Sequence, residues 1–192
     1  MHHDANYEKL FFKLEKFSSP SPGLRDKLFS KTVIRQVAKG NLLLKANNRV
    51  NKLWFLAEGF AKETAHDENY ERISWFYFPG DFMYAYPSFF SQLPAFRDIE
   101  SISKCVLIEI TYVNLIQLRQ EFTELETIID LARDFCEADR AKYASRMQML
   151  NARQRYDRFY NEHSNIFNVA KHKDILSFLG IKADSFSRFY KS

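Results

Sequence analysis

Glycine and proline are scarce in this chain of 192 residues, with five of each, and cysteine occurs only twice. Aromatic residues, in contrast, make up 16% of the chain. Low glycine and proline contents together with many aromatic residues exclude a collagen-like, linker-like or disordered chain. No apolar run approaches the ~18 residues that a membrane helix needs, and the start at 1–4 lacks the pattern of a secretory signal. Cys105 and Cys136 cannot build a disulfide framework. They fit a reducing compartment, so the expected location is cytoplasmic.

Sequence patterns of catalysis are also missing. The five histidines show no metal-ligand spacing with cysteines or acids. A glycine-rich phosphate loop, a nucleophile elbow and paired catalytic carboxylates do not occur either. We therefore expect no metal, no cofactor and no enzymatic activity.

Positive charge is concentrated at the C-terminal end. Residues 151–192 hold eight basic and four acidic groups, so they carry the whole formal excess of +4. Such asymmetry is typical of a part that meets a polyanion joined to a part that does not. Because +4 is a small excess, chance placement explains it equally well at this point.

The middle of the chain has the character of a β domain. Apolar helical spacing predicts a helix at 5–17, and a second short one fits 24–30. Short strand-like runs with turn clusters between them then follow, without helices, which favours an antiparallel sandwich or barrel. The runs are 32–37, 42–45, 53–57, 60–64, 71–78, 98–103 and 106–110.

From Thr111 onward the pattern is helical. Thr111 is a good N-cap for a helix at 112–120, and a run without glycine or proline follows at 124–150. An apolar stripe on the long helix favours a dimer spine that pairs with its twin. The alternative is a helix packed along its own β domain. The stripe residues, and thus the candidate dimer interface, are Ile128, Leu131, Phe135 and Ala138.

The segment 173–190 fits two short helices joined by a tight turn. Ile175 and Leu179 face inward, Gly180 supplies a left-handed corner, and Phe186 and Phe189 hold the second helix down. The outward side chains then suit base and phosphate contacts, with Arg188 suited to a guanine. The alternative is an ordinary helical hairpin. The candidate DNA-binding residues are Lys173, Lys182, Asp184, Ser185, Ser187, Arg188 and Lys191.

Short motifs follow one another along the chain. They are Lys-Gly at 39–40, Leu-Trp-Phe-Leu-Ala-Glu-Gly at 53–59, Phe-Pro-Gly-Asp-Phe at 78–82, Ala-Arg-Gln-Arg-Tyr at 152–156 and the run 175–188. In this order they resemble the Crp/Fnr family of bacterial transcription regulators over nearly the whole chain. The resemblance implies an α+β fold with three parts. They are an antiparallel β-roll (double-stranded jelly roll) of cyclic-nucleotide-binding type at 1–120, a dimerisation helix at 121–150 and a helix-turn-helix domain at 151–192.

Departures from the family pattern fall in the ligand segment. In nucleotide-binding members a Gly-Glu pair holds the ribose, and a later Arg-Ser or Arg-Thr pair holds the cyclic phosphate. Here those positions read Tyr84-Ala85 and Arg97-Asp98. A carboxylate beside a phosphate subsite repels the anion, so we expect that cyclic AMP binding has been lost. The alternative is a rearranged nucleotide site anchored by Arg97.

Aromatic residues crowd the same segment. A cavity lined by rings, with Arg97 at its edge, fits a small apolar or aromatic acid. The alternative is that the rings fill the barrel as core. The candidate pocket residues are Phe82, Tyr84, Ala85, Tyr86, Phe89, Phe90, Phe96, Arg97 and Asp98.

The sequence as a whole predicts a DNA-binding transcription regulator in which the β-roll moves the long helix and so the two recognition helices. The expected partners are double-stranded DNA and a second copy of the chain. An unidentified small-molecule effector and RNA polymerase are further candidates, and no membrane is expected. The alternative is a sensor or scaffold with a degenerate helix-turn-helix that acts through protein contacts. A cupin-like enzyme is disfavoured because metal-binding histidines do not cluster.

Overall fold

The computed structural model describes residues 5–67, 70–84 and 88–190. Its strands form two antiparallel sheets. In sheet A the order is β1 (Thr32–Val37), β8 (Cys105–Thr111), β3 (Lys52–Glu58) and β6 (Phe82–Met83). In sheet B the order is β2 (Leu42–Leu44), β7 (Arg97–Ser101), β4 (Ala61–Asp67) and β5 (Tyr70–Tyr77). The predicted α+β class with an antiparallel β region is confirmed.

The core of the β region forms because inward residues alternate along these strands. Leu56, Ile99 and Leu107 are fully buried there. The tight connection from β3 to β4 needs Gly59, whose φ is +90° and whose added Cβ would lie 2.3 Å from the Lys104 carbonyl oxygen. The sequence motif that ends at this glycine therefore reflects a close approach of two backbones. The short strand β6 was not predicted.

Helices cover one side of sheet A. They are α1 (Ala5–Glu15), α2 (Pro22–Lys31) and α4 (Tyr112–Glu121), and the short α3 (Ser88–Ser91) follows the ligand segment. The Ser21 hydroxyl accepts a hydrogen bond from the Leu24 N–H and caps α2. The Thr111 hydroxyl accepts a hydrogen bond from the Asn114 N–H, so the predicted cap of α4 is confirmed.

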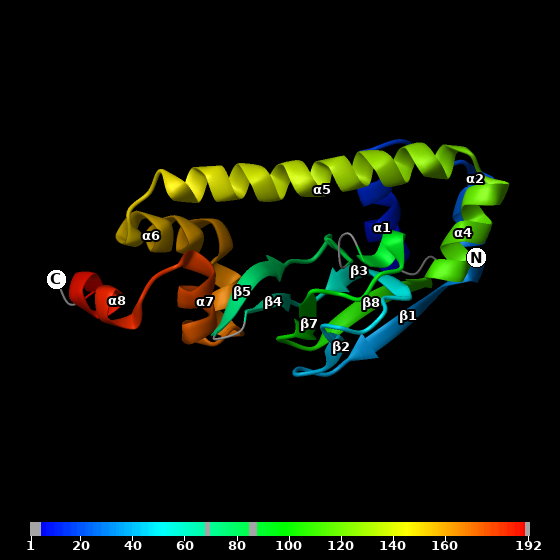
Figure 1. Cartoon of the computed structure of the whole chain (residues 1–192). Coiled ribbons are helices and arrows are strands. Elements are labelled where there is room, and N and C mark those ends of the chain that lie inside the picture. The colour runs from blue at the N-terminus through cyan, green and yellow to red at the C-terminus, as the bar shows by residue number, and fades with distance from the viewer. Residues whose placement is uncertain (1–4, 68–69, 85–87, 191–192) are drawn as a thin grey trace.

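The long helix α5 (Glu124–Gln148) is continuous and passes along the molecule above both sheets (Figure 1). Its first half closes the core with Leu125 and Ile128, which are both buried. Arg140, further along, reaches sheet B. The structure thus agrees with the predicted extent of the helix, and it also shows the helix packed along its own β domain.

The C-terminal part consists of α6 (Ala152–His163), the 3-10 helix η1 (Ser164–Asn168), α7 (His172–Leu179) and α8 (Ala183–Tyr190). A capping box between Asn151 and Gln154 starts α6 immediately after α5 ends. In Figure 1, α7 lies against β5, and α8 lies beyond α7 at the left of the view. A second apolar cluster joins Ile73 and Phe76 of β5 to residues of α6 and α7.

No helix in the described ranges 5–67, 70–84 and 88–190 has the length and apolar character that crossing a bilayer requires.

Candidate functional site

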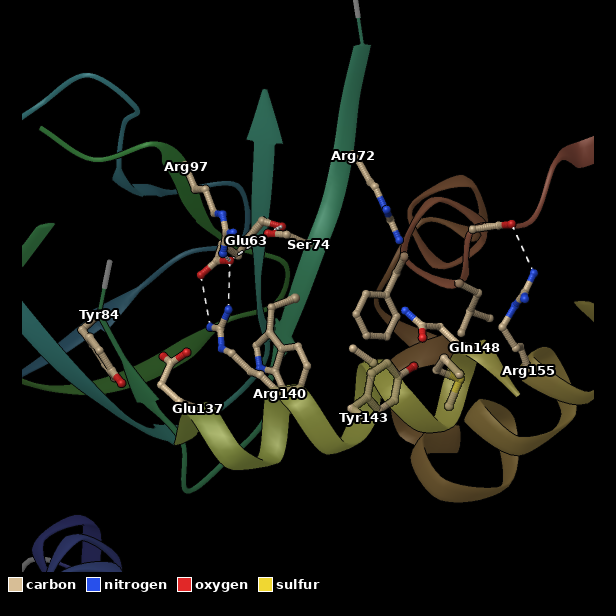
Figure 2. Close-up of a pocket in the computed structure, with 16 residues that line it drawn as sticks. Glu63, Arg72, Ser74, Tyr84, Arg97, Glu137, Arg140, Tyr143, Gln148 and Arg155 are labelled. Atoms are coloured by element: carbon tan, nitrogen blue, oxygen red, sulfur yellow. Dashed lines mark hydrogen bonds and ion pairs between the residues drawn. The ribbon is translucent and has the colours of Figure 1, made fainter. Parts of the chain in front are cut away.

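A hollow of about 610 Å³ lies where sheet B, α5 and the C-terminal helices meet (Figure 2). Arginines dominate its charged lining. The charged lining residues are Arg72, Arg97, Arg140, Arg155, Glu63 and Glu137. Trp75, Tyr143 and Phe178 supply ring surfaces. The hollow is therefore rich in arginine, with ring surfaces beside its charged groups, and Tyr84 is among the rings that line it.

One end of the hollow is built around the carboxylate of Glu63, whose side chain is only 3% exposed. Its Oε1 accepts hydrogen bonds from Ser74 Oγ at 2.7 Å, Arg97 Nη1 at 2.7 Å and Arg140 Nη1 at 3.2 Å. Its Oε2 accepts from Tyr77 Oη at 2.6 Å and Arg140 Nη2 at 3.2 Å. Figure 2 shows Arg97 and Arg140 approaching this carboxylate from different elements. Both oxygens are thus fully engaged inside the chain.

These contacts decide the protonation states. Burial by itself raises the pKa of the Glu63 carboxyl, but Arg140, Tyr77 and Arg97 outweigh it and lower the pKa to about 2. Burial lowers the pKa of Arg140, and Tyr77 and Glu63 more than offset this, so that its pKa is raised overall. Burial and the Glu63 charge raise the pKa of Tyr77. At neutral pH the cluster therefore holds an ionised carboxylate between two charged guanidinium groups.

The other end of the hollow lies near the C-terminal helices. Arg72 extends from β5 toward the hollow (Figure 2). Arg155 of α6 donates from Nη1 to the Leu150 carbonyl at 3.0 Å and from Nη2 to the Gly180 carbonyl at 3.4 Å. The Arg155 side chain therefore links the segment after α5 to the turn between α7 and α8.

Asp98 does not lie where the sequence argument assumed. Its Oδ1 accepts from the Ala46 N–H at 2.6 Å, and its Oδ2 lies 2.9 Å from His66 Nε2. Neighbouring residues of a strand point to opposite faces, so Arg97 and Asp98 diverge. The acid that opposes Arg97 is Glu63, and this corrects the reason given for the expected loss of nucleotide binding.

The predicted pocket residues separate in the structure. Arg97 and Tyr84 line the hollow, whereas Phe96 is 67% exposed and does not line it, which corrects that prediction. Ala85 and Tyr86 lie outside the described residues. Phe82 packs on Phe55 at a ring-centroid distance of 5.4 Å.

The remaining rings of the segment belong to the core. Phe89 is fully buried, and its ring lies 5.1 Å from that of Phe90 and 5.6 Å from that of Tyr112. Phe89 fits the alternative that rings fill the barrel. Phe82, Tyr84 and Phe90 instead line a second, apolar hollow of about 90 Å³ together with residues of α5.

Sequence reasoning missed Glu63 and Arg140. A weak signal existed for Glu63, since it alternates with the buried Ala61 and so faces the core side of β4. Arg140 carried no signal, because a single arginine on a long polar helix face is ordinary. Only the packing of α5 over β4 brings the two together.

Along α5 the expected dimer stripe is divided. Ile128 is 1% exposed and belongs to the core of its own chain. It cannot meet a partner, and this corrects its assignment. Leu131 is 43% exposed, Phe135 is 52% exposed and Ala138 is also exposed. Ile129 and Cys136 form the side of α5 that packs on the N-terminal core here, so Leu131 and Phe135 lie on another side of the helix.

The segment 172–190 forms two short helices with a left-handed turn at Gly180, whose φ is +63°. Ile175, Leu179 and Ile181 are buried as predicted. Lys173, Lys182, Asp184, Ser187 and Arg188 are exposed, and Ser185 is half-buried. Lys191 and the side chain of Phe189 lie outside the described part of the chain.

Leu176 of α7 is buried between this helix and sheet B. It is 6% exposed and belongs to the cluster that packs α7 on β5. The C-terminal unit is docked on the outer face of sheet B, so α7 buries residues on two sides.

Polar bonds reinforce this docking. Lys62 Nζ lies 2.9 Å from Asp174 Oδ2 and 3.4 Å from Glu100 Oε2. The Ile73 N–H donates to Ser177 Oγ at 3.1 Å. Because β5 is an edge strand of sheet B, this bond satisfies a backbone group that an exposed edge leaves open.

Known structures resemble this one, although no family model and no curated protein matches the sequence. The c-di-GMP responsive global regulator CLP of Xanthomonas campestris superposes with a TM-score of 0.69 at 16% identity, over 89% of this chain and 90% of that one. A cyclic nucleotide-binding domain from Methylobacillus flagellatus gives a TM-score of 0.65 at 12% identity, over 72% and 80%. The catabolite activator protein of Thermus thermophilus gives 0.54 at 17%, over 93% and 85%.

The chain has a Crp/Fnr-like fold. Identities this low establish the fold alone. The structural neighbours are regulators and cyclic-nucleotide-binding domains rather than enzymes, and the match to CLP covers nearly all of both chains.

Proposed function

We propose that the chain is a transcription regulator that binds double-stranded DNA as a homodimer through α8, and that its β domain has lost cyclic AMP binding. The observation that carries the proposal is the pair α7 and α8 around Gly180, on a chain whose fold matches 90% of the CLP chain and 85% of the catabolite activator protein chain. The outer face of α8 offers Arg188 and Ser187 to solvent. Such a second helix suits the major groove.

Electrostatics favour the same end of the molecule. Lys171, Lys173 and Lys182 are exposed around α7 and the turn. Asp174, which would weaken a basic surface there, is turned inward onto Lys62. The acid next to Lys173 in the chain is therefore paired within the protein, whereas Asp184 stays exposed beside Ser185. Pairing of Asp174 leaves the exposed lysines in excess around α7, which supports contact with a polyanion.

Loss of cyclic AMP binding follows from Glu63. A phosphate placed against Arg97 would meet a buried carboxylate 2.7 Å from the same guanidinium group. Two anions that compete for one cation in a buried site repel strongly. Calorimetry with millimolar cyclic AMP should show no saturable heat. A dissociation constant near ~10 μM, about −7 kcal/mol, would overturn this part.

The dimer surface is the exposed part of the stripe. Leu131 and Ala138 lie on one side of α5 and are exposed in the single chain. Leu131→Asp combined with Ala138→Asp should give monomers in sedimentation, because charges would be buried at the interface without partners. Lys142→Ala, at an exposed position further along α5, is the control. A monomeric wild type at tens of micromolar, roughly the weak-association range, contradicts the dimer.

The DNA experiment selects genomic fragments bound by the full chain. We expect a pseudo-palindromic motif with half-sites about one helical turn apart. Arg188→Ala should cost about 1–3 kcal/mol per half-site and relax the preference at one base. Lys173→Ala should weaken all sequences alike and flatten the salt dependence. If no motif is enriched, the result favours the scaffold alternative. RNA polymerase is then no longer a candidate partner.

A further inference from the structure

The Glu63 carboxylate bonds to side chains from two elements that are not consecutive in the chain. Arg97 comes from β7 in the β domain, and Arg140 comes from α5 (Figure 2). Arg140 also donates to Tyr77 Oη at 3.0 Å and lies over the Trp75 ring at 4.8 Å. This one residue thus contacts β4 and β5 at once, and it does so beyond the apolar contacts of the first half of α5.

The charges in this cluster satisfy one another. Glu63 is almost wholly buried, and the Arg140 side chain is only 25% exposed. Two guanidinium groups this close would repel each other if the carboxylate were absent, and a buried charge without a partner is strongly unfavourable. The chain itself supplies the anion between Arg97 and Arg140, and these ion pairs lie beside a ring contact between Trp75 of β5 and Tyr143 of α5.

We propose that Glu63 acts as an internal counter-ion in place of an anionic effector, so that α5 stays docked on sheet B without any small molecule. The regulatory consequence rests on the proposed function, because only in a DNA-binding dimer does the position of α5 set the spacing of the recognition helices. The protein is then a regulator whose DNA-binding geometry is permanently set.

A first experiment measures amide hydrogen exchange on the wild-type full chain. The amides of α5 around Arg140 should be protected in the absence of any ligand, and millimolar inorganic phosphate should not change them. Fast exchange without a ligand, or protection that appears only with phosphate, would overturn the proposal.

A second experiment removes the counter-ion and supplies it again. In Glu63→Ala, exchange around Arg140 should become about tenfold faster or more, since a buried charged partner is lost. Formate should restore protection, whereas chloride at equal ionic strength should not. Glu71→Ala, at an exposed position on the neighbouring strand β5, is the matched control. Unchanged exchange in Glu63→Ala, or equal effects of formate and chloride, would contradict the proposal.

Glu63→Gln covers the case in which the alanine variant does not fold. It keeps the volume and the hydrogen-bonding shape but carries no charge, so exchange around Arg140 should rise and formate should have no effect. Wild-type exchange rates in this variant would overturn the proposal. If the wild type binds no DNA, the proposed function fails. The exchange data then still decide whether Glu63 holds α5.

Discussion

The two faces of strand β4 make different kinds of contact. Lys62 and Glu63 are neighbours, so they point to opposite sides of sheet B. Glu63 faces α5 and meets only polar partners, with both carboxylate oxygens engaged. Lys62 faces α7 and forms one short ion pair, with Asp174, at the margin of an apolar contact.

This difference separates two ways of attaching a helix to a sheet. On the inner face the attachment depends on charge, and so on the protonation state of a single carboxyl group. On the outer face it depends on ring packing between Phe76 and Phe178, whose ring centroids are 5.1 Å apart. We therefore expect the inner face to respond to pH and the outer face to respond to changes of side-chain volume.

The largest effect is expected on the outer face. Phe178 is 9% exposed and packs against Trp75, Tyr143 and Phe159 as well as Phe76. Phe178→Ala should lower the free energy of unfolding by about 3–5 kcal/mol, because it leaves a cavity in the contact between α7 and β5. Urea denaturation measures this loss.

Limited proteolysis of the same variant shows whether the C-terminal unit has detached, since Met149 between α5 and α6 is 81% exposed. Faster cleavage near Met149 is expected. Phe12→Ala, at a position 65% exposed, is the control and should change little. A loss below about 1 kcal/mol for Phe178→Ala, the size of a mild surface change, would mean that the docking does not depend on packing.

The next effect is the pH dependence of the inner face. The pKa of Glu63 is about 2 in the folded chain and near 4.5 ordinarily. Because folding lowers this pKa, the ionised carboxyl stabilises the folded state at pH values above about 4.5. This contribution to the free energy of unfolding is lost as the pH falls from about 4.5 to 2. The difference corresponds to roughly 3 kcal/mol.

Urea denaturation at a series of pH values checks this prediction. The wild type should lose its advantage over Glu63→Gln across that range, while the two proteins should run parallel above it. An advantage that persists at pH 2 would show that the charge of Glu63 contributes nothing to the inner face.

The smallest effect concerns the ion pair on the outer face. Asp174→Asn should lower the free energy of unfolding by about 1–2 kcal/mol, because Lys62 keeps Glu100 as a second partner at 3.4 Å. The exposed Asp184 offers the matched control, Asp184→Asn. A double-mutant cycle with Lys62→Met isolates the pair, and a coupling of zero would leave packing as the sole attachment.

Several features of the fold could be predicted from local sequence patterns. The Thr111 cap, the extent of α5 and the Gly180 turn all follow from residues within a few positions of each other. The pocket prediction failed at Asp98, because a strand residue's direction depends on the register with its neighbours, and at Phe96, which precedes β7 and is exposed. A shift of one residue turns a side chain from one face to the other.

The candidate dimer stripe was predicted in part for a related reason. Helical spacing correctly put Ile128, Leu131 and Phe135 on one side of α5. It could not tell which members the β domain would cover, and the structure buries Ile128 while it exposes the other two. Periodicity identifies an apolar face of a helix. Which residues of that face become buried depends on how the β domain packs against the helix.

By itself, the sequence determined the antiparallel β region, the long helix and the two C-terminal helices, because capping, turn chemistry and periodicity act over short distances. Only the tertiary structure decided that Glu63 opposes Arg97, that Arg140 completes the cluster and that Leu176 packs on sheet B. These contacts join residues 34, 77 and more than 100 positions apart. Burial and ion pairing between such distant groups depend on the assembled elements, and no local pattern in the chain encodes them.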